Sequence, residues 1–457
     1  MRRPTPDDDA AAARPRALER LMRPAAVWCG FAVVHLYFLG WMASFFLHGW
    51  AFSDTEQYRE WAMAGYNAPV EGSVSPWVYP VLAQPFILLP RIMGHDLYLL
   101  GWMLMITVLD AVALWFLLHR AHRPAAWELP GPRGGTPDPG AVAHGSSAVL
   151  SRRRAAVVAG WWWVVFTVFM GYLSFARVEG VAAPIVFIGL LHAVRHPVVG
   201  SALLSLATWI KVWPAATVLA MVIALRQRVR IVVTGVVVSA AVVAGVLVLG
   251  GIDKIADFAL NQGSRGMQLE ATLSTPWVWA AVLGIGGSRI ADNTAINSTE
   301  VYGPGVETMA SLMQPLLLVA VLASALLLVR ALRRGADRGR LVYAGSLLLT
   351  LVLIVFNKVG SPQFMIWLAP VIMVGLLHDR VRWRTPALLT LGIAATTFVI
   401  YPLFYTPLIH ANPVMAAVLT TRNALLVALL VWTVRRIWRL GSRAAVDAAD
   451  LGWSAIS

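Results

Sequence analysis

Long apolar stretches separated by short clusters of arginine are the feature that most constrains how this chain can fold. A helix needs about 20 apolar residues to cross the roughly 30 Å hydrocarbon core of a bilayer. The chain offers such stretches repeatedly between residues 24 and 434. The sequence is 58% hydrophobic and only 13% charged, which excludes an ordinary soluble domain of this length. We therefore predict an all-α polytopic membrane protein.

The basic residues indicate orientation in a membrane and not nucleic-acid binding. The formal net charge of +14 comes from short Lys and Arg clusters between apolar stretches, which is the pattern of cytoplasmic loops. One alternation of sides accommodates these clusters and places both termini in the cytoplasm, at a bacterial-type plasma membrane. We expect a disordered cytoplasmic tail at 1–23, a membrane domain at 24–434 and a second cytoplasmic tail at 435–457.

The same alternation predicts a bundle of about 10–12 transmembrane helices. The expected crossings lie at about 24–47, 97–118, 155–175, 178–194, 231–250, 308–331, 341–356, 362–380, 386–405 and 413–434. Residues 77–93 hold three prolines and are expected to enter and leave on the outer side. Residues 197–225 have basic flanks, and each arm reaches only roughly 20 Å as a helix. They predict a broken hairpin with Lys211 near its tip.

The first polar segment after the first apolar stretch is expected to form a helix on the outer membrane surface. Ser53 and Glu56 have the spacing of a capping box, which predicts a helix that begins at Asp54. On that helix Asp54, Tyr58 and Trp61 share one face. The bundle would thus carry a juxtamembrane helix in its first outer loop.

Polar residues from four separate segments are expected to meet at the outer face. Ionisable residues at the membrane surface are unfavourable unless they serve a site or a pathway. A carboxylate base beside several cations suits transfer of a group from a phosphate leaving group. The residues are Asp54, Glu56, Arg177, Glu179, Arg265, Glu270, Lys358 and Gln363.

Several of these residues also have simpler interpretations. Asp54 could serve only as a helix-start acid, worth about 0.3–1 kcal/mol. Arg177 and Glu179 either form an ion pair that fixes a tight turn or bind a donor. Lys211 requires a partner inside the bilayer, either Asp110 or a lipid phosphate. The histidines at the outer side match no zinc spacing, so no metal ligands are assigned.

Six short motifs together resemble a known enzyme family. They are Asp54-x-Glu56, Tyr79-Pro80, Arg177-Val178-Glu179, the segment 210–214 around Lys211, the segment 265–270 from Arg265 to Glu270, and the segment 357–367 that holds Lys358 and Gln363. The chain resembles the GT-C glycosyltransferases that use polyprenyl-phosphate sugars. Within them it is most similar to the bacterial α-mannosyltransferase branch of the phosphatidylinositol-mannoside elongating enzymes. The likeness covers roughly residues 24–380.

The resemblance implies an inverting, single-displacement sugar transfer with Asp54 as the general base. Mannose is the sugar expected first, and the donor would keep its lipid tail in the bilayer. Secondary acidic positions fall on Glu56, Glu179 and Glu270, and donor phosphate contacts on Arg177, Lys358, Arg265 and Lys211. Contacts with the acceptor or the sugar are expected at Tyr58, Trp61, Tyr79 and Gln363.

Two functions from different classes are therefore weighed. The first is a mannosyltransferase that uses a polyprenyl-phosphate donor and a lipid-linked or glycan acceptor outside the cytoplasm. The second is a transporter or flippase for a lipid or sugar-lipid, a class that usually shows two related halves. We expect no cofactor, and because Glu56 stands where the family more often has Asp, the need for a divalent metal stays open.

Overall fold

The described part of the chain is a bundle of long apolar helices. The computed structural model describes residues 19–64, 77–120, 141–248, 266–293 and 298–453. Within these residues, eight helices are long and apolar enough to cross a membrane. They are α2 (Pro24–Trp41), α6 (Tyr98–Arg120), α7 (Ala141–Met170), α11 (Arg228–Val248), α14 (Val306–Arg333), α15 (Arg338–Val355), α17 (Arg384–Phe398) with the following η6 (Val399–Leu403), and α19 (Pro413–Trp453). The protein is therefore a multi-pass, α-helical membrane protein, as the hydropathy pattern predicts.

Two of the ten predicted crossings are shorter helices inside the bundle. α8 (Glu179–Ala193) covers the first, and η5 (Pro362–Trp367) followed by α16 (Leu368–His378) covers the second. α8 is about 22 Å long at 1.5 Å per residue, which is less than a hydrocarbon core. Nearly all residues of these helices are buried in protein. Eight of the ten expected crossings are thus matched by helices of sufficient length and apolar composition.

The predicted broken hairpin is confirmed. α9 (Pro197–Thr208) and α10 (Ala215–Ala224) are two short arms, and Lys211 lies in the irregular segment between them. Residues 77–93 form only α5 (Ala83–Leu88) and η1 (Leu89–Met93). Both are too short to cross a bilayer, in agreement with the prediction for this stretch.

One boundary and one class of structure differ from the predictions. The last helix does not end at residue 434, because α19 continues to Trp453 through the segment expected to be a tail. The chain is not purely helical either. β1 (Arg289–Asn293) and β2 (Ser298–Tyr302) form an antiparallel pair in which Ile290 lies opposite Val301. Strands of five residues bounded by glycines are too short to give a periodic signal of their own. Most of the predicted tail at 1–23 lies outside the described residues.

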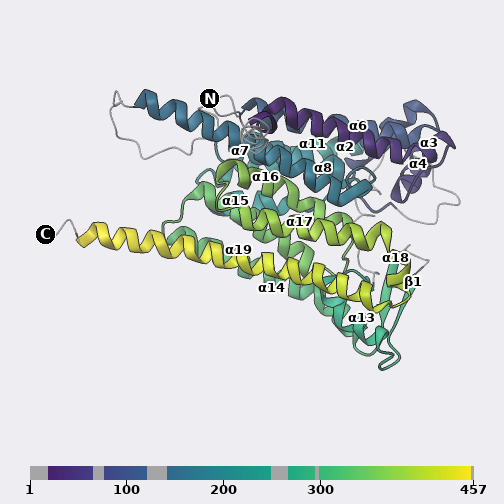
Figure 1. Cartoon of the computed structure of the whole chain (residues 1–457). Helices are drawn as coiled ribbons and strands as arrows, with labels where there is room; N and C mark the ends of the chain where they lie inside the picture. Colours follow the sequence, from purple (N-terminus) through teal and green to yellow (C-terminus); the bar gives the residue numbers. More distant parts are fainter. Residues whose placement is uncertain (1–18, 65–76, 121–140, 249–265, 294–297, 454–457) are drawn as a thin grey trace, which may run out of the picture.

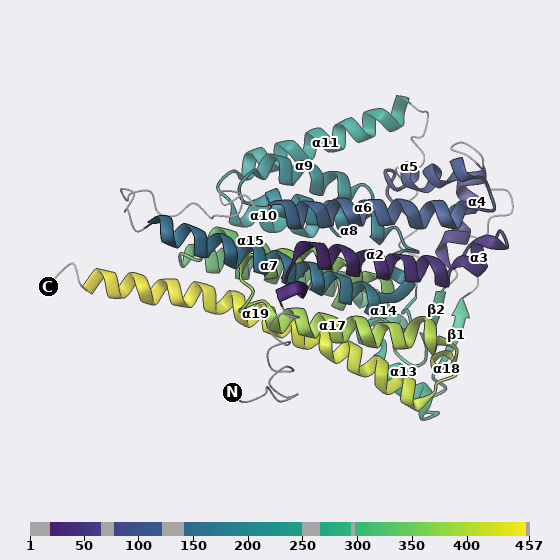
Figure 2. The ribbon, with the colours of Figure 1, turned by 45° about the horizontal axis from the view of Figure 1, so that its top comes forward.

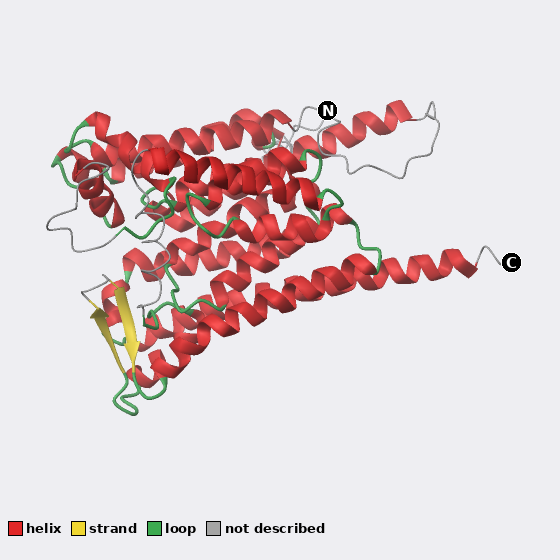
Figure 3. Ribbon diagram, turned by 180° about the vertical axis from the view of Figure 1, so that it is seen from behind, coloured by secondary structure: helices red, strands yellow, loops and turns green. Residues whose placement is uncertain are grey.

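Short elements gather at one end of the bundle, which we call the polar end. α3 (Ala43–Leu47), α4 (Asp54–Ala64), α18 (Tyr405–Ile409) and the β hairpin lie there, while the carboxyl end of α19 lies at the opposite end (Figures 1 and 2). α13 (Thr275–Val282), preceded by η4 (Thr272–Ser274), packs beside the hairpin. Figure 3 shows the two strands at the same end from behind. Segments distant in sequence therefore meet at the polar end.

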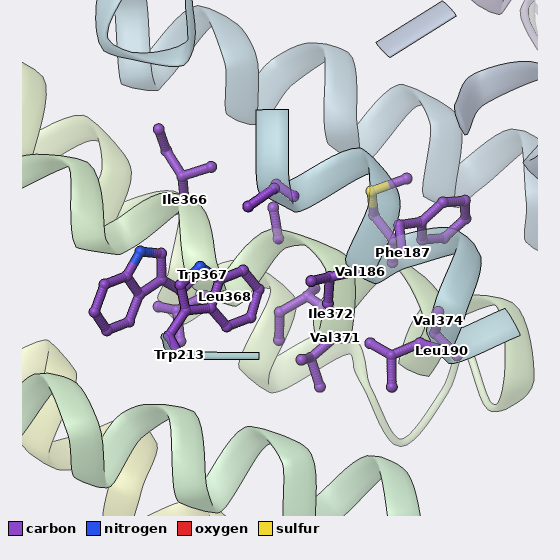
Figure 4. Close-up of a cluster of buried hydrophobic side chains, with 14 of the residues drawn as sticks. Val186, Phe187, Leu190, Trp213, Ile366, Trp367, Leu368, Val371, Ile372 and Val374 are labelled. Atoms are coloured by element: carbon purple, nitrogen blue, oxygen red, sulfur yellow. The ribbon is translucent and has the colours of Figure 1, made fainter. Parts of the chain in front are cut away.

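The centre of the bundle is an apolar cluster that fixes α8. Val186, Phe187 and Leu190 of this helix pack near Trp213 and Trp367 (Figure 4). The two indole rings stack with centroids 5.7 Å apart. Because α8 is anchored in this core, its first residue, at the polar end, has a fixed position.

Gly200→Ala tests the close contact between α8 and α9. A Cβ at Gly200 would lie 2.8 Å from the Cα of Ala193 and 3.0 Å from its backbone nitrogen. Backbone atoms cannot rotate away, so we expect a loss of about 1–3 kcal/mol from overpacking. The control is Gly245→Ala in α11, where nothing lies within 4 Å and about 0.5–1 kcal/mol should be gained. Denaturant titration in detergent measures both, and equal stabilities would contradict the packing.

Candidate functional site

The segment that leads into α4 is held by tertiary contacts and not by the predicted capping box. Ser53 has a left-handed backbone with φ of 56°. Its Oγ accepts a hydrogen bond from Arg177 Nη2 at 2.9 Å and shares one with the Tyr401 hydroxyl at 3.1 Å. The backbone nitrogen of Glu56 donates to the Ser53 carbonyl instead, at 3.1 Å. The capping-box prediction is wrong because partners far along the chain occupy the serine hydroxyl.

Asp54 forms an ion pair with Arg177. Arg177 lies in the turn between η3 (Gly171–Ser174) and α8, and its side chain is 6% exposed, while that of Asp54 is 32% exposed. Burial alone lowers the pKa of Arg177, but the Asp54 carboxylate raises it, and the pKa stands well above its ordinary value. A charged guanidinium therefore sits beneath a carboxylate that solvent or a ligand can reach.

A second ion pair lies nearby. Lys211 Nζ is 3.0 Å from a carboxylate oxygen of Glu179, and the Glu179 side chain is completely buried. The predicted alternative of an Arg177–Glu179 ion pair is thus wrong, because each residue pairs elsewhere. Lys211 does not pair with Asp110 either; Asp110 faces His35, with 3.6 Å between the Nε2 and the carboxylate.

Tyr79 and Tyr58 connect the two ion pairs. Their hydroxyls share a hydrogen bond of 2.9 Å, and Lys211 Nζ lies 4.4 Å from the centre of the Tyr79 ring. Burial raises the pKa of Tyr79 far above its ordinary value, and the carboxylates of Asp54 and Glu179 raise it further. Both carboxylates are therefore within electrostatic range of the same phenol, which stays neutral.

Aromatic rings line the Tyr58 side of this cluster. The Trp61 ring stacks on Tyr58 at 6.1 Å and contacts Trp77 at 4.8 Å. Tyr58 also lies 4.9 Å from Trp102. Tyr58, Trp61 and Tyr79 therefore lie together in one buried aromatic cluster.

The loop that carries Gln268 and Glu270 contacts the loop that carries Lys358 and Gly360. The Gln268 nitrogen donates to the Lys358 carbonyl at 3.0 Å, and its side-chain oxygen accepts from the Gly360 nitrogen at 2.9 Å. A Cβ at Gly360 would overlap the backbone of Glu270 and Ala271. The segments of the chain that carry Lys358 and Glu270 are therefore in main-chain contact.

Glu270 lies buried beside Arg422 of α19. Arg422 donates to the Glu270 carbonyl, and its Nε donates to Asn423 at 3.1 Å. Burial raises the pKa of Glu270 to about 7, although Arg422 and Arg177 act in the opposite direction. In the sequence, Arg422 stands out only as a charged residue within the last apolar stretch. In the structure, its hydrogen bond to the Glu270 carbonyl holds the loop of Glu270 against α19.

The remaining predicted residues are only partly brought together. Glu56 binds Arg59 instead of joining the ion pairs, and Arg265 lies outside the described residues. Gln363 is buried in η5, and among the described residues its side-chain oxygen has no hydrogen-bond partner. Tyr401, which sequence analysis missed, lies with its ring centre 6.0 Å from the Arg177 guanidinium. It is separated from Ser53 by almost 350 residues, so no local signal could have found it.

Comparison with known proteins identifies no similar protein. No family model, curated protein or solved structure matches the chain. Across the part of the chain with assigned coordinates, no three His, Cys, Asp or Glu residues are close enough to hold a metal ion. The chemistry that this site can perform therefore depends on its ion pairs.

Lys211→Met tests the buried ion pair with Glu179. Removing the lysine leaves a fully buried carboxylate without its cation, and we expect a loss of about 3–5 kcal/mol. The double variant Lys211→Met with Glu179→Gln removes both charges and should recover most of this loss. Arg382→Met, which breaks the exposed pair with Asp379, serves as control and should change stability by about 0–1 kcal/mol. A Lys211→Met protein as stable as the parent in detergent would contradict the pairing.

Proposed function

We propose that the protein is an inverting glycosyltransferase that transfers a sugar, with mannose as the first candidate, from a polyprenyl-phosphate donor to a glycolipid or glycan acceptor. The observation that carries the proposal is the ion pair between half-buried Asp54 and buried Arg177, beside the Lys211–Glu179 pair. The GT-C-like motifs support it in part, because five of the residues that they mark lie in this cluster: Asp54, Tyr79, Arg177, Glu179 and Lys211.

Asp54 would act as the general base. Its carboxylate takes the proton of an acceptor hydroxyl while that oxygen attacks the anomeric carbon of the sugar. The bond between this carbon and the phosphate oxygen breaks on the opposite face, and its electron pair leaves with the polyprenyl phosphate. One displacement inverts the anomeric configuration. A base held within reach of the acceptor contributes about 10²–10⁴-fold to such a step.

The cations would bind the donor phosphate. Arg177 offers a planar fork that matches phosphate oxygens, and Lys211 supplies a compact second charge. A phosphate that draws Arg177 away from Asp54 would release the carboxylate for proton transfer. The rings of Trp61 and Tyr79 would hold the sugar, with Gln363 as a further polar contact.

The proposed orientation places the polar end outside the cytoplasm of a plasma membrane. The opposite end carries arginines at the start of α15, around the start of α17 and in the second half of α19. Clusters of this kind favour the cytoplasmic side. The donor tail would then lie in the bilayer beside the bundle, with its phosphate at the polar end.

Asp54→Asn tests the base. The amide keeps the shape but cannot accept the proton, so sugar transfer should fall by at least about 100-fold. Purified protein is supplied with polyprenyl-phosphate mannose and a phosphatidylinositol-mannoside acceptor, and the mannosylated lipid is measured. The matched control is Glu60→Gln, an exposed acid on the same helix, which should keep full activity.

Two outcomes would reject the proposal. Full activity in a correctly folded Asp54→Asn protein would show that Asp54 is not the general base. Movement of labelled lipid-linked sugar across vesicles without any sugar transfer would favour the transporter or flippase instead. The buried His35–Asp110 pair inside the bundle is the observation that keeps this second function in view.

A further inference from the structure

Tyr401 reaches the Asp54–Arg177 ion pair from a distant part of the sequence. Its hydroxyl shares a hydrogen bond of 3.1 Å with the Oγ of Ser53, 348 positions away. The same Oγ accepts the hydrogen bond from Arg177 Nη2 at 2.9 Å. The two hydroxyls therefore form a short chain of hydrogen bonds that ends on the guanidinium.

The backbone around Tyr401 fixes its position. A residue that precedes a proline is restricted to extended conformations, and Tyr401, before Pro402, has φ of −131° and ψ of 114°. It interrupts the helical path between α17 and α18. A Cβ at Gly171 of η3 would overlap the ring of Phe398 at the end of α17. Because η3 leads into the turn of Arg177, the segments that carry Tyr401 and Arg177 are packed against each other.

Ser53 is held in an unfavourable backbone conformation. A left-handed φ of 56° is uncommon for a residue with a side chain, and such a conformation persists where the surrounding structure holds it. The hydrogen bonds with Arg177 and Tyr401 act on the Ser53 hydroxyl. Asp54, the next residue, binds Nη1 of the same guanidinium. Two consecutive residues therefore bind the two terminal nitrogens of Arg177.

Arg177 is consequently oriented before any ligand binds. A ligand that must immobilise a long, flexible side chain loses affinity through the entropy of ordering it. A guanidinium that Ser53 already holds at Nη2 would lose less freedom when a phosphate takes the place of Asp54 at Nη1. The Tyr401 hydroxyl is one hydrogen bond further from the phosphate than Ser53.

We infer that Tyr401 is a positioning residue, which holds Arg177 through Ser53 in the orientation that binds the phosphate of a polyprenyl-phosphate ligand. Tyr401 acts through Ser53 and needs no contact with the phosphate itself. The inference rests on the proposed function, in which Arg177 binds the donor phosphate, but it does not depend on the transfer step.

Binding of decaprenyl phosphate to the purified full-length protein in detergent tests the inference. Tyr401→Phe removes the hydroxyl and keeps the ring, whose centre lies 6.0 Å from the guanidinium. The Kd should rise up to about tenfold, because a released Arg177 must be immobilised on binding. The number of lipid molecules bound per protein should stay the same. A loss of folded protein would lower that number and leave the Kd unchanged.

Ser53→Gly provides the second part of the test. Glycine adopts a left-handed φ without strain, so this variant removes the hydroxyl without straining the backbone. The double variant with Tyr401→Phe should bind no more weakly than Ser53→Gly alone, because Tyr401 then has no hydroxyl to act through. The matched control is Tyr98→Phe, which loses a different buried hydrogen bond, of 2.8 Å to the Ile87 carbonyl. The control should keep the Kd of the parent.

Three results would overturn the inference. The first is an unchanged Kd in Tyr401→Phe or, if that variant does not fold, in Ser53→Gly. The second is a double variant in which the two increases in Kd multiply, since Tyr401 would then act independently of Ser53. The third is an equal increase in Tyr98→Phe. The unfolding temperature of each variant checks its folding.

The same measurement separates this inference from the proposed function. A parent protein that binds decaprenyl phosphate but transfers no sugar would reject the glycosyltransferase and leave the role of Tyr401 intact. A parent protein that transfers sugar, with a Kd that does not respond to Tyr401→Phe, would reject the role of Tyr401 alone. A parent protein that binds no lipid phosphate would reject both.

Discussion

Buried charges must be paired in a protein surrounded by lipid, and this constraint organises the whole polar end. An unpaired ion in a medium of low dielectric constant is strongly destabilising. Arg177 with Asp54, Lys211 with Glu179 and His35 with Asp110 each bring together residues from different segments of the chain. Each pair therefore fixes how the helices around it are placed.

The first two pairs differ in a way that matters for chemistry. Glu179 is fully buried, while 17% of the Lys211 side chain stays exposed, and their pair holds the start of α8 against the broken hairpin. Asp54 is partly exposed, so its pair with Arg177 can exchange partners with an incoming ligand. The hydrogen bond between Tyr58 and Tyr79 lies between the two pairs. A fixed pair thus supports an exchangeable one.

Hydropathy predicted the eight long helices and the broken hairpin correctly because the bilayer imposes a length on every crossing. The expected crossings at α8 and α16 are shorter helices, and their apolar residues are buried against protein. Sequence motifs marked Asp54, Arg177, Glu179 and Lys211 as one site. They could not assign the partners, since the geometry of pairing depends on helix packing. Ser53 is the clearest case. The capping-box spacing predicts a pairing between Ser53 and Glu56, but the Ser53 hydroxyl is hydrogen-bonded to Arg177 and Tyr401.

The glycine at 360 sets the spacing between the two loops at the polar end. Since no side chain fits between Gly360 and the backbone of residues 270 and 271, the loops touch through their main chains. The Gln268 side chain adds a hydrogen bond from the Gly360 nitrogen to that contact. The lysine two residues earlier is consequently carried on a rigid support, and any homologue that keeps this spacing must keep a residue without a side chain at that position.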